Sequence, residues 1–343
     1  MIKLTLKDIA KHFEVSISTV SKSLHDSHEI SHELKSKIQT YAKENHYKPN
    51  KVALNLLNRS TKSIGVIIPN ILNYFFVQVL YGIEKVANER GYNIISCISD
   101  HSLKKEAMTL ELLSSGSVDG LILSSVASEK QTSTHVGKIK EIVDYQIPLV
   151  MFDRVIDAIE CDKVIVDDFQ AGYKATKYLL DTGCRNIGII TPINNTKIGR
   201  LRIEGYKQAL NEREIAFDDK LITPIEAKDD LEFILSFILN DKNIDGILAL
   251  DEITAVKTME IIKARGYHVP NDISIIGFTN GQLSRYVTPA LTMVSQHGSY
   301  IGELCANKLI DRIENISTQG SFDTKVVKTS LMVRESTRKI PLG

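Results

Sequence analysis

The sequence contains no tryptophan, only four cysteines in 343 residues, and no net charge, since 42 Lys and Arg balance 42 Asp and Glu. Cys97, Cys161, Cys184 and Cys305 are far apart and form no CxxC or His–Cys cluster, which argues against a zinc site or redox pair and predicts reduced, buried thiols. No apolar run approaches the roughly 18 residues of a membrane span, and the N-terminus lacks a signal-peptide core. We therefore expect a cytoplasmic protein with no membrane partner, metal or cofactor.

Charge is unevenly distributed along the chain. Residues 1–62 carry eleven Lys or Arg against six Asp or Glu, a net +5, whereas the rest of the chain carries 31 against 36, a net −5. The basic excess belongs to the N-terminal segment alone, so a polyanionic partner is expected there.

Short apolar runs recur through the long part of the chain and are typical of buried parallel strands. They are Ser63–Pro69, Tyr92–Ile98, Gly120–Ser124, Pro148–Phe152, Asn186–Thr191, Gly246–Leu250 and Ile273–Phe278. Amphipathic stretches with helical spacing lie between them: Phe75–Arg90, Leu103–Ser115, Gln170–Thr182, Arg202–Arg213 and Glu252–Arg265. This alternation predicts a doubly wound α/β architecture with parallel sheets.

There are more strand–helix units than one sheet usually contains. A short sequence pattern at the end of a predicted helix also repeats, as E-R-G-Y at Glu89–Tyr92 and A-R-G-Y at Ala264–Tyr267. Two similar lobes, each binding at the carboxyl edge of its strands, would hold a ligand in the cleft between them. A single large enzyme domain is the alternative. It ranks lower because the sequence has no GxGxxG or GxxxxGK[ST] loop and no GxSxG nucleophile motif.

The basic N-terminal segment has the spacing of a helix-turn-helix. Apolar residues within Leu6–Leu24 define two short helices, and Thr5 and Ser16 stand where each helix needs an N-cap. A third helix, expected from about Ser31 to Asn45, closes the small core.

In such a unit the second helix enters the major groove of DNA. Its exposed residues are expected to meet base edges, namely Ile17, Ser18 and Lys22. Short hydroxyl side chains suit phosphate oxygens, namely Thr5, Ser16, Thr19 and Ser21. The alternative is that these hydroxyls only cap helices, which is a strong explanation for any one of them and a weak one for all.

The motif L-K-D-I-A-K-H-F-E-V-S-I-S-T-V-S-K at Leu6–Lys22, followed by Y-K-P-N-K-V-A at Tyr47–Ala53, resembles the lactose-repressor/galactose-repressor (LacI/GalR) family. Further segments match in order and spacing: Gly91–Ile94, Ser117–Leu123, Pro148–Arg154, Val166–Asp168, Arg202–Tyr206, Asp272–Phe278 and Val333–Thr337. The resemblance thus spans the whole chain.

The resemblance implies an all-α helix-turn-helix headpiece at 1–48, a hinge helix within 49–62, and an α/β effector and dimerisation domain at 63–343. That domain would have two lobes like periplasmic sugar-binding proteins. The N-lobe would comprise about 63–165 and 296–325, and the C-lobe about 166–295 and 326–343.

The resemblance also implies that hinge residues Asn50 and Leu56 contact DNA, with Leu56 wedged into the minor groove. Simple helix packing is the alternative for this leucine.

Two headpiece residues depart from the family pattern. Glu14 stands where relatives usually carry Gly, so a left-handed backbone there would cost about 1 kcal/mol or more. Ile17 replaces a polar or aromatic base reader, which favours contact with thymine methyls.

Sugar recognition uses planar side chains against a ring face and Asp, Asn or Arg against hydroxyls. Carried over from the family, the effector residues are Phe75, Phe76, Asp153, Arg202, Asp251, Thr279 and Asn280. Thr279 and Asp251 depart from the residues usual in relatives. One of the two phenylalanines is expected to be buried in the core, and a salt bridge between the lobes is the alternative role for Asp153 and Arg154.

These features together predict a homodimeric, sequence-specific regulator that represses transcription from double-stranded operator DNA. A small effector, a sugar or sugar phosphate, would control its affinity; a purine that acts as corepressor is the alternative. A solute-binding protein would need an export signal and no helix-turn-helix, and an α/β enzyme would need a catalytic motif. We therefore expect that the protein is neither.

Overall fold

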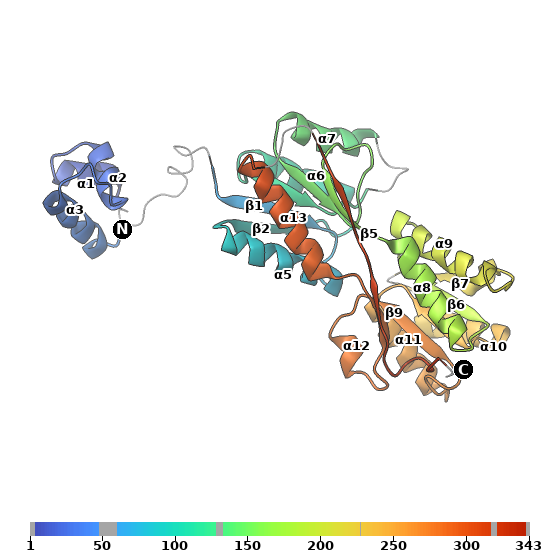
Figure 1. Cartoon of the computed structure of the whole chain (residues 1–343). Coiled ribbons are helices and arrows are strands. Elements are labelled where there is room, and N and C mark those ends of the chain that lie inside the picture. The colour runs from blue at the N-terminus through green and yellow to red at the C-terminus, as the bar shows by residue number, and fades with distance from the viewer. Residues whose placement is uncertain (1–3, 48–59, 128–132, 227, 317–320, 341–343) are drawn as a thin grey trace. The chain divides into compact units, whose positions relative to one another are not determined.

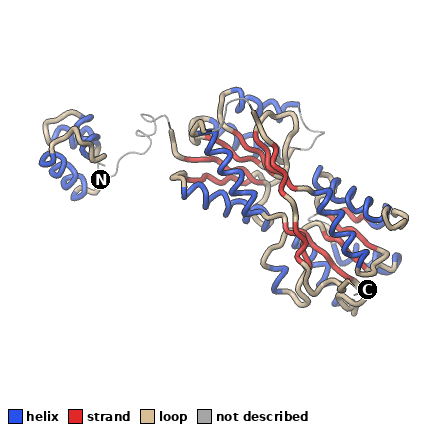
Figure 2. Tube along the Cα trace, in the orientation of Figure 1, coloured by secondary structure: helices blue, strands red, loops and turns tan. Residues whose placement is uncertain are grey.

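The computed structural model describes residues 4–47, 60–127, 133–226, 228–316 and 321–340 (Figures 1 and 2). It divides the chain into two compact units, Met1–Thr61 and Lys62–Gly343. Most of the predicted hinge, with Asn50 and Leu56, lies outside the described residues. Within the described ranges, every helix is too short or too polar to cross a membrane.

Within residues 4–47, the first unit forms a bundle of three helices: α1 (Leu6–His12), α2 (Ile17–Leu24) and α3 (His32–Glu44). The Thr5 hydroxyl accepts a hydrogen bond from the backbone N–H of Asp8, and the Ser16 hydroxyl accepts one from Thr19, so both predicted caps are present. One small core joins the helices, formed by Ile9, Ala10, Val20, Ile38 and Ala42. This is the helix-turn-helix that the apolar spacing predicts.

The turn between α1 and α2 has the left-handed backbone expected at Glu14, with φ = 53°. The backbone N–H of Val15 reaches back to the carbonyl of Ala10 at 3.0 Å, which closes the turn. Glycine adopts this backbone conformation without strain, whereas for Glu14 it costs roughly 1 kcal/mol.

The second unit contains two six-stranded sheets. The first has the order β11-β5-β4-β3-β1-β2, with every neighbouring pair parallel. Its strands are β1 (Ser63–Ile68), β2 (Asn93–Ile98), β3 (Gly120–Leu123), β4 (Leu149–Phe152), β5 (Asp162–Val166) and β11 (Thr324–Val327). Its helices are α5 (Tyr74–Glu89), α6 (Leu103–Ser114), α7 (Ser133–Asp144) and α13 (Gly298–Ile313).

Alternate residues of a strand face opposite sides of a sheet, and β1 buries both sides. Ile64, Val66 and Ile68 pack with residues of α5 and α13, whereas Ile67 packs with residues of α6 and α7. Continuous apolar runs are required for this double coverage, which is why the sequence predicts these strands well.

The second sheet has the order β12-β10-β9-β8-β6-β7, and only its β10–β12 pair is antiparallel. Its strands are β6 (Ile187–Thr191), β7 (Ile222–Pro224), β8 (Gly246–Ala249), β9 (Ser274–Phe278), β10 (Thr292–Ser295) and β12 (Ser330–Met332). Helices α8 (Asp168–Asp181) and α9 (Lys197–Asn211) contribute to one core cluster, and α10 (Leu231–Lys242) and α11 (Glu252–Ala264) to another. Short helices follow at Asp219–Leu221 and α12 (Leu283–Tyr286).

The chain passes between the two sheets three times, after β5, after β10 and between β11 and β12. The third passage lies between Val327 and Ser330, slightly beyond the lobe boundary expected at 325. Each lobe is therefore built from discontinuous segments, and Asp153 and Thr279, at the carboxyl ends of β4 and β9, line a shared pocket.

Candidate effector site and DNA-reading surface

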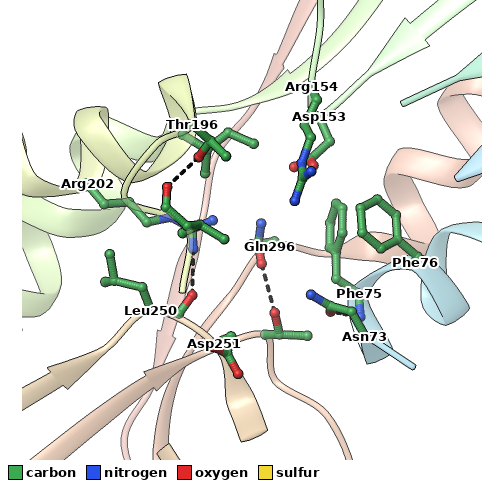
Figure 3. A pocket seen from close by; sticks show the side chains of 13 residues that line it. Asn73, Phe75, Phe76, Asp153, Arg154, Thr196, Arg202, Leu250, Asp251 and Gln296 are labelled. Carbon is green, nitrogen blue, oxygen red and sulfur yellow. Dashed lines mark hydrogen bonds between the residues drawn. The ribbon is translucent and has the colours of Figure 1, made fainter. Parts of the chain in front are cut away.

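A pocket lies between the two lobes, with about 390 Å³ of empty space that is partly open to solvent (Figure 3). Its lining residues are Asn73, Phe75, Phe76, Asp153, Arg154, Ile193, Thr196, Ile198, Arg202, Leu250, Asp251, Thr279 and Gln296. Six of the seven predicted effector residues are thus brought together.

Two of these residues occupy equivalent positions in the lobes. Asp153 directly follows β4 and Thr279 directly follows β9, and both have a left-handed backbone, with φ of 57° and 68°. The N–H of Asp153 donates to Val164 at 3.1 Å, and that of Thr279 donates to Val294 at 3.0 Å. A β-branched residue in this conformation is strained, and such strain concentrates at functional sites.

The aromatic side of the pocket comes from the start of α5. Asn73 caps this helix, its side-chain oxygen accepting from the N–H of Phe75 at 3.0 Å. Phe75 and Phe76 are both buried, whereas only one was expected to be, and their ring centroids are 5.2 Å apart in an edge-to-face arrangement. Figure 3 shows both rings beside Asn73, at one wall of the pocket.

Arg202 lies on the opposite wall, on α9. The prediction that this helix begins near Arg202 was wrong, because Thr196 caps it and the helix begins at Lys197. Arg202 is only 3% exposed. Its Nε donates to Asp168 Oδ1 at 2.8 Å, its Nη1 donates to the carbonyl of Leu250 at 3.0 Å, and its guanidinium lies 4.1 Å from the centre of the Phe278 ring.

Asp153 and Arg154 are adjacent in the pocket wall, yet neither forms an ion pair with another described residue. The predicted alternative, a salt bridge between the lobes at this position, is therefore not formed. Burial raises the pKa of Asp153 to about 6, with Arg154 opposing the rise. Nη1 of Arg154 lies 3.4 Å from His101 Nδ1, and its buried Nε has no hydrogen-bond partner among the described residues.

The remaining predicted residues follow β8 and β9. Asp251 caps α11, accepting from the N–H of Thr254 at 2.9 Å and from its hydroxyl at 2.6 Å, and also lines the pocket. The hydroxyl of Thr279 donates to Gln296 Oε1 at 3.0 Å. Asn280 does not line the pocket, which corrects its predicted place in the site: its side-chain oxygen accepts from Arg334 Nη2.

The DNA-reading face expected on α2 is open to solvent. Ser16, Ile17, Ser18 and Lys22 are exposed, while Thr19 and Ser21 are half-buried. Ile17 is 49% exposed, although an isoleucine in a helix this small would ordinarily contribute to the core. The hydroxyls of Thr5 and Ser16 serve as caps, so capping accounts for two of the predicted phosphate contacts in the free protein.

Comparison with known proteins identifies both units. The model for bacterial regulatory proteins of the lacI family matches residues 5–50, and that for the periplasmic binding protein-like domain matches residues 176–337. The ribose operon repressor of Haemophilus influenzae is 32% identical over 97% of this chain and 98% of its own length. The chain belongs to the LacI family.

Solved structures agree with this assignment. A LacI-family regulator from Enterococcus faecium with bound ribose is 29% identical, with a TM-score of 0.69 over 80% of this chain and 98% of its own. The lac repressor dimer bound to operator is 20% identical and has a TM-score of 0.85 over 98% and 100% of the two chains, which supports the fold. This LacI-family chain is a DNA-binding transcription regulator controlled by a small ligand, and it is not an enzyme.

The sequence interpretation of this LacI-family chain left several lining residues out of the site. Asn73 is the N-cap of α5, and Gln296 follows β10, a strand of sequence Thr-Met-Val-Ser with only two apolar residues. The sequence suggests a salt bridge as the alternative role for Arg154, and it assigns no role to Thr196. Helix-capping propensity is the one signal that marks Asn73 and Thr196 in advance.

Proposed function

We propose that the chain is a repressor whose effector is a neutral monosaccharide held between the lobes. The observation that carries this proposal is the arrangement of two buried phenylalanine rings on one wall and hydrogen-bonding side chains around the others. A sugar ring presents an apolar face to aromatic groups and hydroxyls at its rim. Asp153, Arg154, Arg202 and Gln296 supply acceptors and donors at that rim.

The charges in the wall favour a neutral ligand over a sugar phosphate. Arg154 and Arg202 bring two positive charges, and Asp153, Asp251 and the Arg202 partner Asp168 bring three carboxylates. A phosphate carries about −1.5 to −2 charges at neutral pH and needs uncompensated donors. Because the carboxylates outnumber the arginines here, the pocket has no excess positive charge to balance a phosphate.

Among the relatives, some are named ribose operon repressors and others are named PurR, so the proposal of a sugar draws on the former group. One is named a ribose operon repressor, and the Enterococcus faecium regulator was solved with ribose. Polar groups on several walls suit hydroxyls that project all round a ring, whereas a flat purine exposes polar atoms only at its edges. This favours a sugar over the purine alternative.

We expect a screen by thermal shift to detect this specificity. D-ribose and related monosaccharides should raise the melting temperature by roughly 5 °C or more at a hundred times the Kd, since binding then adds about 2.7 kcal/mol. Ribose 5-phosphate and hypoxanthine, tested separately as control ligands, should change the melting temperature by less than about one degree. A shift with hypoxanthine alone, accompanied by altered operator affinity, would replace the sugar with a purine.

On the headpiece, we propose that Ile17, Ser18 and Lys22 read bases and that the hydroxyls of Thr5, Ser16, Thr19 and Ser21 contact phosphates. The exposure of Ile17, Ser18 and Lys22 on α2 and the excess of basic residues in this segment support the proposal. Asn50 and Leu56 remain proposed DNA contacts of the hinge. A regulator with these contacts acts where chromosomal DNA is, in the cytoplasm.

We propose that a second copy covers the edge of the first sheet. The edge strand β2 and its flanking helices expose large apolar side chains: Tyr81, Ile95, Met108 and Leu112, with exposures of 66%, 39%, 62% and 64%. Such a patch on an uncovered sheet edge is typical of an interaction surface. A homodimer also gives two headpieces, as a two-fold symmetric operator requires.

Light scattering of the free protein should give about twice the chain mass of 38.3 kDa. Replacing Met108 and Leu112 with Glu should shift the protein to monomers and weaken operator binding at least tenfold, because charge is costly in a buried apolar interface. The matched control is Phe237→Glu on α10, an equally exposed apolar residue that should stay dimeric. A monomeric or stably tetrameric wild type would contradict the proposal.

A further inference from the structure

An ion pair joins the DNA-reading helix to the loop that follows it. Lys22, in the last turn of α2, donates from Nζ to Glu29 Oε2, and the two side chains are 45% and 54% exposed. Lys22 is the basic residue on this helix, and Glu29 is an acid placed beside it on the surface proposed to meet DNA.

The loop that carries Glu29 is itself held in place. The N–H of Ser27 donates to the carbonyl of Lys22 at 3.0 Å. Lys35 of α3 forms an ion pair with Asp26 at 2.8 Å and donates to the carbonyl of Ser27 at 3.3 Å, with its side chain only 14% exposed. The loop is thus bound to both neighbouring helices, which restricts where the Glu29 carboxylate can be.

Stability alone does not explain the pair. Exposed ion pairs contribute little to folding, and a carboxylate near the reading helix repels the phosphates of any DNA. The pair has a different consequence for the lysine. An ammonium has three N–H donors, so one donated to Glu29 leaves two for acceptors on a base.

We propose that Glu29 is a positioning residue that sets sequence discrimination by holding the Lys22 ammonium over the bases and away from the phosphates. This rests on the proposed role of Lys22 as a base reader. Fixing a flexible lysine before binding removes part of the ordering cost at the operator, where two adjacent acceptors such as guanine O6 and N7 await it. On random DNA the same restraint keeps the charge from the backbone. Both effects widen the ratio of operator to random affinity.

The test uses the full-length protein and two duplexes of equal length, one selected from a randomised pool by the wild type and one of random sequence. Binding is followed by fluorescence anisotropy over a range of salt concentrations. For Glu29→Gln, random DNA should bind about threefold tighter, and operator should bind no tighter or up to about threefold weaker, because a surface pair is worth only a few-fold. The slope of log affinity against log salt on random DNA should steepen by about 0.9, the signature of one added phosphate contact.

The matched control is Glu33→Gln. It removes the same charge from an exposed pair with Lys37 within α3, at 2.6 Å, without touching the reading helix. Both duplexes should then bind tighter by one common factor, which leaves their ratio unchanged. If Glu29→Gln behaves like Glu33→Gln, Glu29 contributes only its charge and the positioning proposal is overturned.

The variant Lys22→Ala distinguishes two negative results: that Glu29 does not position Lys22, and that Lys22 does not contact bases at all. Alone, it should weaken operator binding at least tenfold more than random binding; equal losses would show that Lys22 contacts phosphate and would remove the basis of both proposals. In the Lys22→Ala background, adding Glu29→Gln should change both duplexes equally. A ratio that still falls in that background would show that Glu29 acts without Lys22, contrary to the positioning proposal.

Discussion

Arg202→Ala should abolish the response to the effector while operator binding of the ligand-free protein stays within a few-fold. We expect effector affinity to fall at least about a hundredfold, since each hydrogen bond from a charged donor contributes roughly 1.5–3 kcal/mol. Titration calorimetry gives the affinity, and anisotropy with operator DNA gives the response. A ligand shifts the regulator between states only through its differential affinity for them, so losing the contact stops the switch.

The contacts of Arg202 explain why Arg202→Ala should lose effector affinity and why it should also lose stability. Asp168 Oδ1 lies 2.8 Å from both Nε and Nη2, and the Leu250 carbonyl accepts from Nη1. Each terminal nitrogen carries two N–H groups, so one N–H of Nη1 and one of Nη2 remain for a ligand. The same contacts hold α9 to the neighbouring elements. Truncation leaves Asp168 buried at 4% exposure without its partner, which costs about 3–5 kcal/mol. The variant should therefore also melt at a lower temperature.

A second variant separates ligand contact from scaffold. Arg202→Gln combined with Asp168→Asn replaces the ion pair by a neutral pair and avoids the unpaired carboxylate. This double variant should melt close to wild type and still fail to respond. Arg200→Ala, an exposed arginine on the same helix, should bind effector normally. Wild-type effector affinity in the double variant would remove Arg202 from the site.

The sequence predicts seven strands and misses five, and neither length nor burial alone separates the two sets. The four-residue strands β3, β4 and β8 are predicted, whereas β10, which is equally short and buried throughout, is missed. Each strand predicted from an apolar run is present to within one residue at either end. The missed strands are β5, β7, β10, β11 and β12, of three to five residues. In β11, for example, three of four residues are exposed, and its place is set by pairing with β5 far away in the sequence. Local periodicity carries no record of such pairing.

Whether a site residue could be predicted depends on whether the strand before it was predicted. The family resemblance implies Asp153 and Thr279 as site residues, and both directly follow predicted strands, where parallel sheets bind ligands. Gln296 depends on the missed strand β10 and could not be located in this way. Asn280 fails for another reason: the chain turns after Thr279, and Arg334, from a segment more than fifty residues later, takes the Asn280 side chain. A contact of that range is fixed by tertiary structure, not by position after a strand.

Effector binding should depend on pH through Asp153. The ionised carboxylate accepts hydrogen bonds from sugar hydroxyls through both oxygens and more strongly than the protonated acid does, and burial raises its pKa to about 6 in the free protein. Because the effector binds the ionised form, binding releases a proton when the pH is near or below 6. Affinity should therefore be constant above pH 7 and fall below pH 6, approaching tenfold for each further pH unit. At pH 5 it should be about tenfold weaker than at pH 7.5.

Calorimetric titrations between pH 5 and 8 would measure this profile, and repeating them in buffers of different ionisation enthalpy would count the protons released. Asp153→Asn should bind more weakly at neutral pH and show a flat profile from pH 5 to 7, because the amide does not titrate. His101 must be separated from Asp153, since it lies beside Arg154, and burial and that arginine lower its pKa. His101→Gln should keep the step near pH 6 if the carboxyl group causes it. A step that persists in Asp153→Asn and disappears in His101→Gln would assign the pH dependence to the histidine, and Asp153 would then serve the fold of the β4 turn rather than the effector.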